Sequence, residues 1–269
     1  VCATDELCIS GRCEVLTGGG PKNILFVSDV LSDTNIPAAL RADGHTVVEV
    51  TGDYATGNAA LTGSLSAYHM VYWSATGSGA GSTHSTTVIA ALESWVTSGR
   101  CVFVTGYDSI ASPTDPALIA FVGGTGSRDV PGAVGPVSSA PNSLNVGAVD
   151  IRSVTPTGGY SDRDALTGLS GVTVAAYSTG STTEAQWTVR TLGAGEIAYV
   201  SNGQSSASAF SGRPLDMPSC QDPSGQVWRM RSVTLNSIMV IIPNNHMRAT
   251  GFWTSARVMI PSTPPRNET

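Results

Sequence analysis

The chain has 269 residues, of which 41% are hydrophobic and only 13% are charged, about half of the usual charged fraction. Its net charge is -6 and its only lysine is Lys22, so it lacks the basic surface that binding to a nucleic-acid backbone requires. No apolar run reaches 18 residues, which excludes a predicted membrane span. We therefore expect a globular protein that acts on a small molecule or a carbohydrate, with the polar but uncharged surface that suits an extracellular protein.

Three of the five cysteines lie close together, in CATDELCISGRC at residues 2–13. This density predicts a disulfide-stapled turn formed in an oxidising compartment, and the lack of a CxxC pair disfavours zinc. The pattern C-x-x-D-x-x-C-x-x-G-x-C resembles the short Cys-rich units that precede domains in bacterial secreted proteins. We predict a Cys-rich segment and linker over residues 1–20, and a secreted, extracellular or periplasmic protein. Cys101 and Cys220 either pair with each other or one is a buried thiol.

The main domain is predicted over residues 21–242, with a C-terminal extension over 243–269. An apolar run at 24–27 stops abruptly at Ser28-Asp29, which is typical of a buried parallel strand that ends in a polar loop. A short helix is expected after it, within 33–44, and Pro37 near its start and Gly44 at its end support this interpretation. Strands are expected at 45–50 and 69–74, with a weak helix or a loop over 55–68 between them.

The clearest helix is predicted over 86–98, because its apolar residues recur at helical spacing and Gly99 ends it. It leads directly into a strand at 101–105. A helix of this length between two apolar strands predicts a parallel pair. Further along, the patterns predict a short helix at 115–122, strands near 144–151 and at 172–177, 186–191 and 196–200, and a closing helix over 227–242.

The order of these elements over residues 22–203, together with the passage SGRCVFVTGYDS, resembles the class I glutamine amidotransferase-like group, including its ThuA-like branch. The resemblance implies an α/β fold with a flavodoxin-like (Rossmann-like), mainly parallel sheet flanked by helices. In amidotransferases, the turn after this strand holds a nucleophilic cysteine. Here Tyr107 or Asp108 occupies that place and Cys101 lies at the other end of the strand, so the resemblance implies the scaffold without its thiol nucleophile.

Candidate catalytic residues follow the predicted strands, because ligands of open α/β sheets bind outside the carboxyl ends of the strands. Asp29 and Asp108 could act as acid and base or hold a cation, since two close carboxylates shift each other's pKa. His84 could be a general base and Ser109 or Ser28 a nucleophile. The structural alternative makes His84 an exposed or helix-capping residue.

Further residues of the same loops are candidates for substrate binding: Ser28, Asp33, Ser78, Gly79 and Tyr107. The glycines around Ser78 leave backbone N–H groups that could stabilise an oxyanion, whereas Asp33 could also simply cap the next helix. No organic cofactor is expected, because carboxylates in the first loop would repel a phosphate. A divalent cation such as calcium could be held by Asp29, Asp33 and Asp108.

Two classes of function fit these features. The first is a secreted hydrolase that cleaves an ester or glycoside bond with the strand-end acids and His84. The second is a non-catalytic extracellular module that keeps the amidotransferase-like scaffold and binds carbohydrate or protein. The arrangement of the strand-end side chains distinguishes the two classes.

Overall fold

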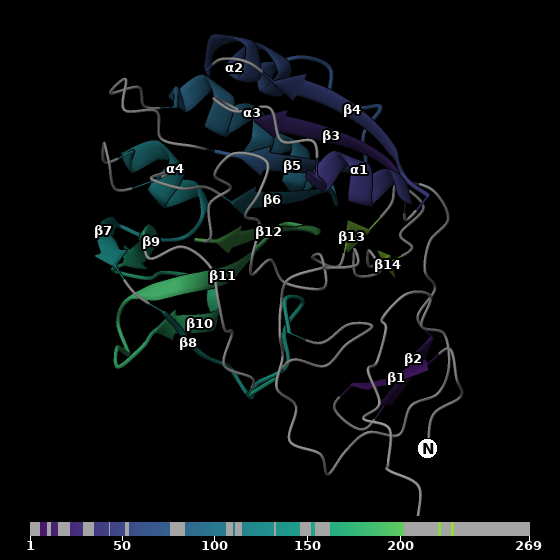
Figure 1. Ribbon diagram of the computed structural model, residues 1–269. Coiled ribbons are helices and arrows are strands. Elements are labelled where there is room, and N and C mark those ends of the chain that lie inside the picture. The colour runs from purple at the N-terminus through teal and green to yellow at the C-terminus, as the bar shows by residue number, and fades with distance from the viewer. Residues whose placement is uncertain are drawn as a thin grey trace, which may run out of the picture.

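The computed structural model describes residues 6–9, 12–15, 22–28, 35–42, 44–51, 54–75, 84–105, 110, 115–131, 133–145, 152–153, 162–201, 220–221 and 227–228. Its centre is a 10-stranded mixed sheet with helices on both faces (Figure 1). Two further strand pairs lie outside this sheet: β1 (Glu6–Ile9) with β2 (Arg12–Val15), and β13 (Cys220–Gln221) with β14 (Val227–Trp228).

The parallel half of the sheet has the order β4-β3-β5-β6-β12. Its strands are β3 (Asn23–Ser28), β4 (Thr46–Thr51), β5 (Met70–Ser74), β6 (Cys101–Thr105) and β12 (Gly195–Val200). Every residue of β5 and β6 is buried, as expected for strands covered on both faces. In chain order this is 2-1-3-4-5, the flavodoxin-like order that the sequence predicts.

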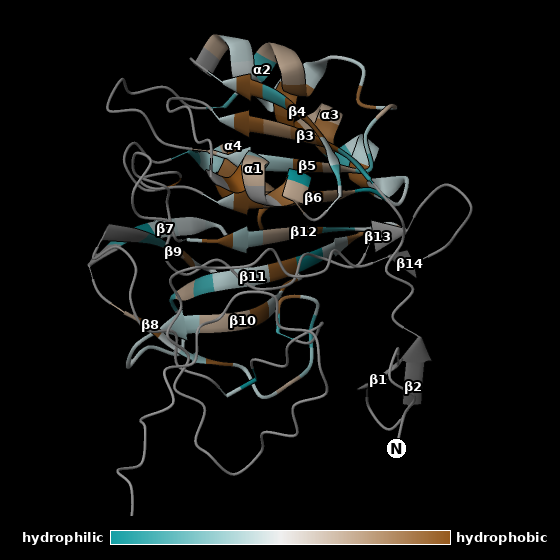
Figure 2. Ribbon diagram, turned by 45° about the vertical axis from the view of Figure 1, so that its right-hand side comes forward, coloured by the Kyte–Doolittle hydropathy of each residue, from teal (hydrophilic) through white to brown (hydrophobic). Residues whose placement is uncertain are grey.

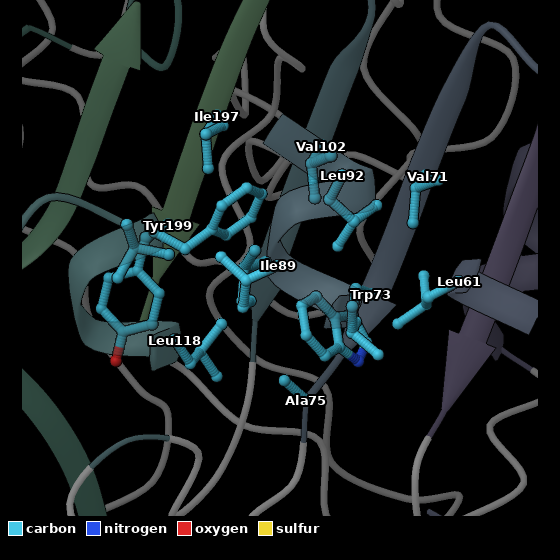
Figure 3. Packing of buried hydrophobic residues seen from close by; sticks show 14 of the residues in the cluster. Leu61, Val71, Trp73, Ala75, Ile89, Leu92, Val102, Leu118, Ile197 and Tyr199 are labelled. Atoms are coloured by element: carbon cyan, nitrogen blue, oxygen red, sulfur yellow. The ribbon is translucent and has the colours of Figure 1, made fainter. Parts of the chain in front are cut away.

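Helices cover the two faces of the parallel half unequally. The helices are α1 (Asn35–Ala42), α2 (Tyr54–Thr62), α3 (Thr86–Thr97) and α4 (Pro116–Phe121). Alternate strand residues point to opposite faces, so Ile24 and Phe26 pack with α1, while Leu25 and Val27 belong to the cluster beneath α2, α3 and α4. Figure 2 shows the apolar strands enclosed between these layers. Figure 3 shows the second cluster, in which Ile89 of α3 packs among side chains of β5 and β12.

The antiparallel half continues the sheet beyond β12 through β11, β10 and β8. Its strands are β7 (Gly126–Pro131), β8 (Val134–Val137), β9 (Asp162–Thr167), β10 (Thr173–Ser178) and β11 (Ala185–Leu192), with β9 joining β7 to β11. Gly195, at the turn into β12, lies so close to the end of α3 that a Cβ atom would come 2.1 Å from the carbonyl oxygen of Arg100. Only glycine fits this approach.

Several predicted elements are confirmed and others are wrong. The strands at 45–50, 69–74, 101–105, 172–177, 186–191 and 196–200 and the helices at 86–98 and 115–122 are present, and 54–62 is helical. Leu144 is not in a strand but in a turn, where its N–H donates to Asn142 Oδ1 at 3.0 Å. Val227 and Trp228 form β14 instead of a helix. Asn145 is also in the turn that contains Leu144, while residues 146–151, 229–242 and the extension 243–269 lie outside the described residues. The division at residues 20 and 242 stays a prediction.

The edge strand β4 is shielded by a charged pair. Thr46 N–H donates to the Lys22 carbonyl next to β3, so by alternation the carbonyl of Val47 faces the free edge. Arg41 Nη2 donates to this carbonyl at 3.0 Å, and the same guanidinium forms an ion pair with Glu49. Val48 is the one large hydrophobic residue recorded as exposed in the described part of the chain, at 42%. The pair therefore blocks the part of the edge at which another strand could bind.

Arg41→Ala should promote self-association, because it uncovers the Val47 carbonyl beside exposed Val48. Sedimentation velocity over a range of protein concentrations would detect a concentration-dependent dimer in this variant. Arg128→Ala is the matched control, since Arg128 also forms an exposed ion pair, with Glu184, but lies on β7. Equal sedimentation of both variants at every concentration would contradict the shielding role.

Two imidazoles hold the start of β3 at the amino edge of the sheet. His45 Nδ1 accepts the N–H of Lys22 at 3.2 Å, and His69 Nδ1 accepts the N–H of Asn23 at 3.0 Å. Both rings must carry no proton on Nδ1 to accept these bonds. Burial and, second, the charge of Lys22 lower the pKa of His45 below its usual 6.5. The unfolded chain therefore binds the proton more readily than the folded one.

The stability contributed by His45 should be complete above about pH 6.5 and decline as the pH falls below it, because the unfolded state then gains protons first. One such group changes the free energy of unfolding by at most about 1.4 kcal/mol per pH unit. Urea unfolding of His45→Gln between pH 5 and 8 should show a shallower pH dependence than the wild type. An unchanged slope would exclude His45 as the titrating group.

Candidate functional site

The carboxyl edge of the parallel strands ends in a row of hydroxyl groups. Thr51, Ser28, Ser74 and Thr105 are neighbours in register on β4, β3, β5 and β6. By alternation their side chains lie on the α1 face of the sheet, and the last three are at most 1% exposed. The loops that carry the predicted acids begin directly after these residues. The sequence analysis singled out only Ser28 from this row.

His84 and Asp115 form a buried pair near the same edge. His84 Nδ1 lies 2.7 Å from Asp115 Oδ2, and both side chains are 2% exposed. The ring of His84 packs edge-on against Trp73 with a centroid distance of 4.5 Å, which places it on the face covered by α3 and α4. The prediction that His84 is exposed is therefore wrong, because its polar atoms are paired inside the fold instead of hydrated.

Asp115 is the N-cap of α4 and serves three donors at once. Its Oδ1 accepts the N–H of Leu118 at 3.0 Å, and its Oδ2 accepts the backbone N–H of His84 at 2.7 Å as well as the ring contact. Burial alone would raise the pKa of Asp115, but the hydrogen bonds from His84 and Leu118 and the charge of His84 outweigh it, so the pKa is lowered. An ionised Asp115 accepts the Nδ1 proton of His84, so the neutral ring is held in its Nδ1–H tautomer.

A second buried carboxylate anchors the loop after β6. Asp164 of β9 is completely buried, and its Oδ2 accepts the N–H of Ile110 at 2.7 Å. Ser127 Oγ donates to the carbonyl of Ile110 at 3.0 Å, and Tyr199 Oη donates to the carbonyl of Asp164 at 3.1 Å. Two buried acids, Asp115 at the start of α4 and Asp164 on β9, thus hold the backbone of His84 and Ile110 in place.

Most residues predicted for the site lie outside the described residues: Asp29, Asp33, Ser78, Gly79, Tyr107, Asp108 and Ser109. Their convergence stays a prediction. Of the two described candidates, Ser28 lies on the α1 face and His84 on the opposite face, so the structure does not bring these two side chains together. No cluster of three or more His, Cys, Asp or Glu residues that could hold a metal is found in the described part of the chain.

The sequence analysis missed Asp115 as a partner of His84. The signal for a cap was present, because Asp115 precedes Pro116 at the first position of a predicted helix. The pairing with a histidine 31 residues earlier is a tertiary contact that no local pattern contains. Asp164 was missed because its partner Ile110 is also distant in the sequence. In addition, the charged residues of its strand are typical of an exposed segment.

Comparisons with known proteins find similarity to solved structures alone. No family model and no curated protein matches the chain. Among solved structures, it is similar to the cytoplasmic protein STM1381 from Salmonella typhimurium LT2, with 12% identity, 69% of this chain and 89% of that chain covered, and a TM-score of 0.45. A ThuA-like protein from Bacteroides uniformis ATCC 8492 has 10% identity, 72% and 87% coverage and a TM-score of 0.44. The exo-β-1,4-mannosidase Op5Man5 from Opitutaceae bacterium strain TAV5 has 16% identity over 68% of this chain and 31% of that one, with a TM-score of 0.37.

The strand order decides the fold. The chain has an α/β architecture, in which a mixed sheet with the flavodoxin-like order β4-β3-β5-β6-β12 in its parallel half is flanked by helices. No helix in the described ranges has the length and apolar character that a bilayer-spanning segment needs.

Asp115→Ala should lower the free energy of unfolding by about 3–5 kcal/mol, because it leaves the buried ring of His84 and two backbone N–H groups without their acceptor. Asp129→Ala is the control, since Asp129 is exposed on β7. Urea denaturation at pH 7 would measure both. The wild-type contribution is present above about pH 3.8 and is lost as the pH falls through the lowered pKa of Asp115. A loss no larger than that of the control would contradict the anchoring role.

Proposed function

We propose that the chain is a secreted hydrolase of ester or glycoside bonds in which His84, oriented by Asp115, is the general base. The observation that carries this proposal is the 2.7 Å contact of His84 Nδ1 with a carboxylate whose pKa is lowered. A carboxylate in this position selects the imidazole tautomer whose Nε2 accepts a proton from a hydroxyl group or water. Exclusion of water from the pair strengthens this interaction.

The remaining roles in this proposal belong to the loops that follow the parallel strands. Ser109 would be the nucleophile of an ester hydrolase, while Asp29 and Asp108 would act as acid and base on a glycoside or hold a divalent cation such as calcium. In the ester reaction His84 removes the proton from the Ser109 hydroxyl as the new bond between Ser109 and the substrate carbonyl carbon forms. It then returns this proton to the leaving oxygen.

A panel of chromogenic esters, phosphoesters and glycosides, assayed with calcium or with EDTA, tests the proposal. His84→Gln should lower kcat/KM by about 100-fold or more on any substrate that the wild type turns over, since general base catalysis contributes about 10²- to 10⁴-fold. Asp129→Asn should leave kcat/KM unchanged. Circular dichroism would establish that each variant is folded. Turnover that survives in folded His84→Gln would overturn the assignment of the base.

A second candidate is a non-catalytic extracellular module that binds carbohydrate or protein. The observation that favours it is the burial of the pair, because side chains that are 2% exposed and fully used in capping α4 can be explained by stability alone. If no substrate in the panel is turned over, binding of the labelled protein to a glycan array becomes the deciding measurement. Retained glycan binding by His84→Gln would then support the module.

A further inference from the structure

The starting observation concerns Cys101, the first residue of β6. Its side chain is completely buried and its sulfur is part of a disulfide, so it is not the free thiol that was one of the two expectations. The chain has four other cysteines, at positions 2, 8, 13 and 220. The identity of the partner decides which two parts of the chain are covalently joined.

The strand pairing favours one partner. Cys101 is the register neighbour of Glu196, the second residue of β12. Strand β13, which begins with Cys220, packs against β12 and lies beside the end at which β12 begins (Figure 1). Cys220 therefore lies on β13, next to β12, and β12 in turn pairs with the strand that begins with Cys101.

Two of the other cysteines face each other in the hairpin near the N-terminus. Cys8 and Cys13 are directly opposite each other in the β1–β2 hairpin, with two residues between Ile9 and Arg12. In a hairpin with a two-residue loop, this second pair is of the non-hydrogen-bonded kind, with Cα atoms about 4.5 Å apart. That separation lies within the range that a disulfide spans. The backbone of the hairpin thus offers Cys8 and Cys13 each other as partners.

We propose that Cys101 and Cys220 form a disulfide that fastens the β13–β14 hairpin to the amino edge of the parallel sheet. The bond forms by thiol–disulfide exchange. One thiolate attacks glutathione disulfide and releases one glutathione, and the second thiolate displaces the other glutathione from the mixed disulfide. The two cysteines lose two protons and two electrons, and glutathione disulfide is reduced to two thiols.

The cross-link has consequences for where the protein folds and for its redox stability. It closes a loop across most of the sheet, from the start of β6 to β13, and restricts the unfolded chain accordingly. Because Cys101 is completely buried, reductants reach its sulfur only when the surrounding structure opens. A bond of this kind forms in an oxidising compartment, which agrees with secretion. The assignment is independent of the proposed role of His84.

Tryptic digestion distinguishes the possible disulfide partners of Cys101. The full chain is first refolded in a glutathione redox buffer and alkylated without reduction. Trypsin places the cysteines in four peptides, 1–12, 13–22, 101–128 and 191–229, by cleaving after Arg12, Lys22, Arg100, Arg128, Arg190 and Arg229. The last of these peptides is not cut after Arg213, because Pro214 follows it. Mass spectrometry should find 101–128 joined to 191–229. Finding 101–128 joined to 1–12 or 13–22, or carrying an alkylated thiol, would overturn the proposal.

A stability measurement provides a second test. Cys220→Ser should melt at a lower temperature than the oxidised wild type, and dithiothreitol should lower the wild type to the level of this variant. Dithiothreitol should leave the melting temperature of Cys220→Ser nearly unchanged. Cys8→Ser is the matched control and should retain the response of the wild type. An equal response of Cys220→Ser and wild type to the reductant would contradict the cross-link.

Discussion

The parallel pairing of β12 with β6 is the constraint on which the rest of the architecture depends. All five residues from Cys101 to Thr105 are buried and lie in register with Glu196 to Val200. The same β12 pairs on its other side with β11 in the antiparallel sense. The strand β12 thus joins the parallel half to the antiparallel half. Because β12 comes after all the other strands of this sheet in the chain, the sheet is continuous only once β12 has paired with both β6 and β11.

The packing around this junction explains why it is rigid. Arg190 of β11 donates to the carbonyl of Phe121 at 2.8 Å and pairs with Glu93 of α3 at 3.0 Å, so the antiparallel half is tied to two helices of the parallel half. Tyr199 of β12 is completely buried and reaches the backbone of β9. These contacts place Asp164, and with it Ile110, relative to α4 and Asp115.

The His84–Asp115 pair shows how closely a structural explanation and a catalytic one can coincide. Capping α4, fixing the start of α3 and excluding water are contributions to stability, and the same contacts hold the imidazole of His84 in one orientation. An active site on rigid elements needs both properties. The pair is therefore compatible both with an enzyme and with a binding module that has the same fold. A measurement of catalytic activity distinguishes these two functions.

The sequence predicts the parallel half well, because continuous apolar runs such as those of β5 and β6 arise where a strand is covered on both faces. It predicts β10 and β11 of the antiparallel half but misses β7, β8 and β9. β7 and β9 carry charged residues, and β8 contains Pro136, so these strands do not show the apolar alternation of a half-buried sheet.

The candidate site could also be predicted only in part. The location of the site at the carboxyl edge follows from the ends of the apolar runs, and Ser28 was found in this way. The partners of His84 and Ile110 could not be found, because the hydrogen bonds of Asp115 and Asp164 join residues 31 and 54 positions apart. Burial of a carboxylate depends on donors supplied by distant elements, and a local pattern does not contain them.

The turns of the antiparallel half differ in how much space surrounds them, and this difference indicates where a reporter group could be attached. The β11–β12 turn is pressed onto the end of α3, so that a Cβ atom at Gly193 would come 2.6 Å from the carbonyl oxygen of Thr97. The turn between β10 and β11 is open, and a Cβ atom at Gly180 would meet nothing within 4 Å. A fluorophore or affinity tag inserted beside Gly180 would therefore protrude into solvent at the carboxyl edge of the sheet, on the far side of β12 from β6.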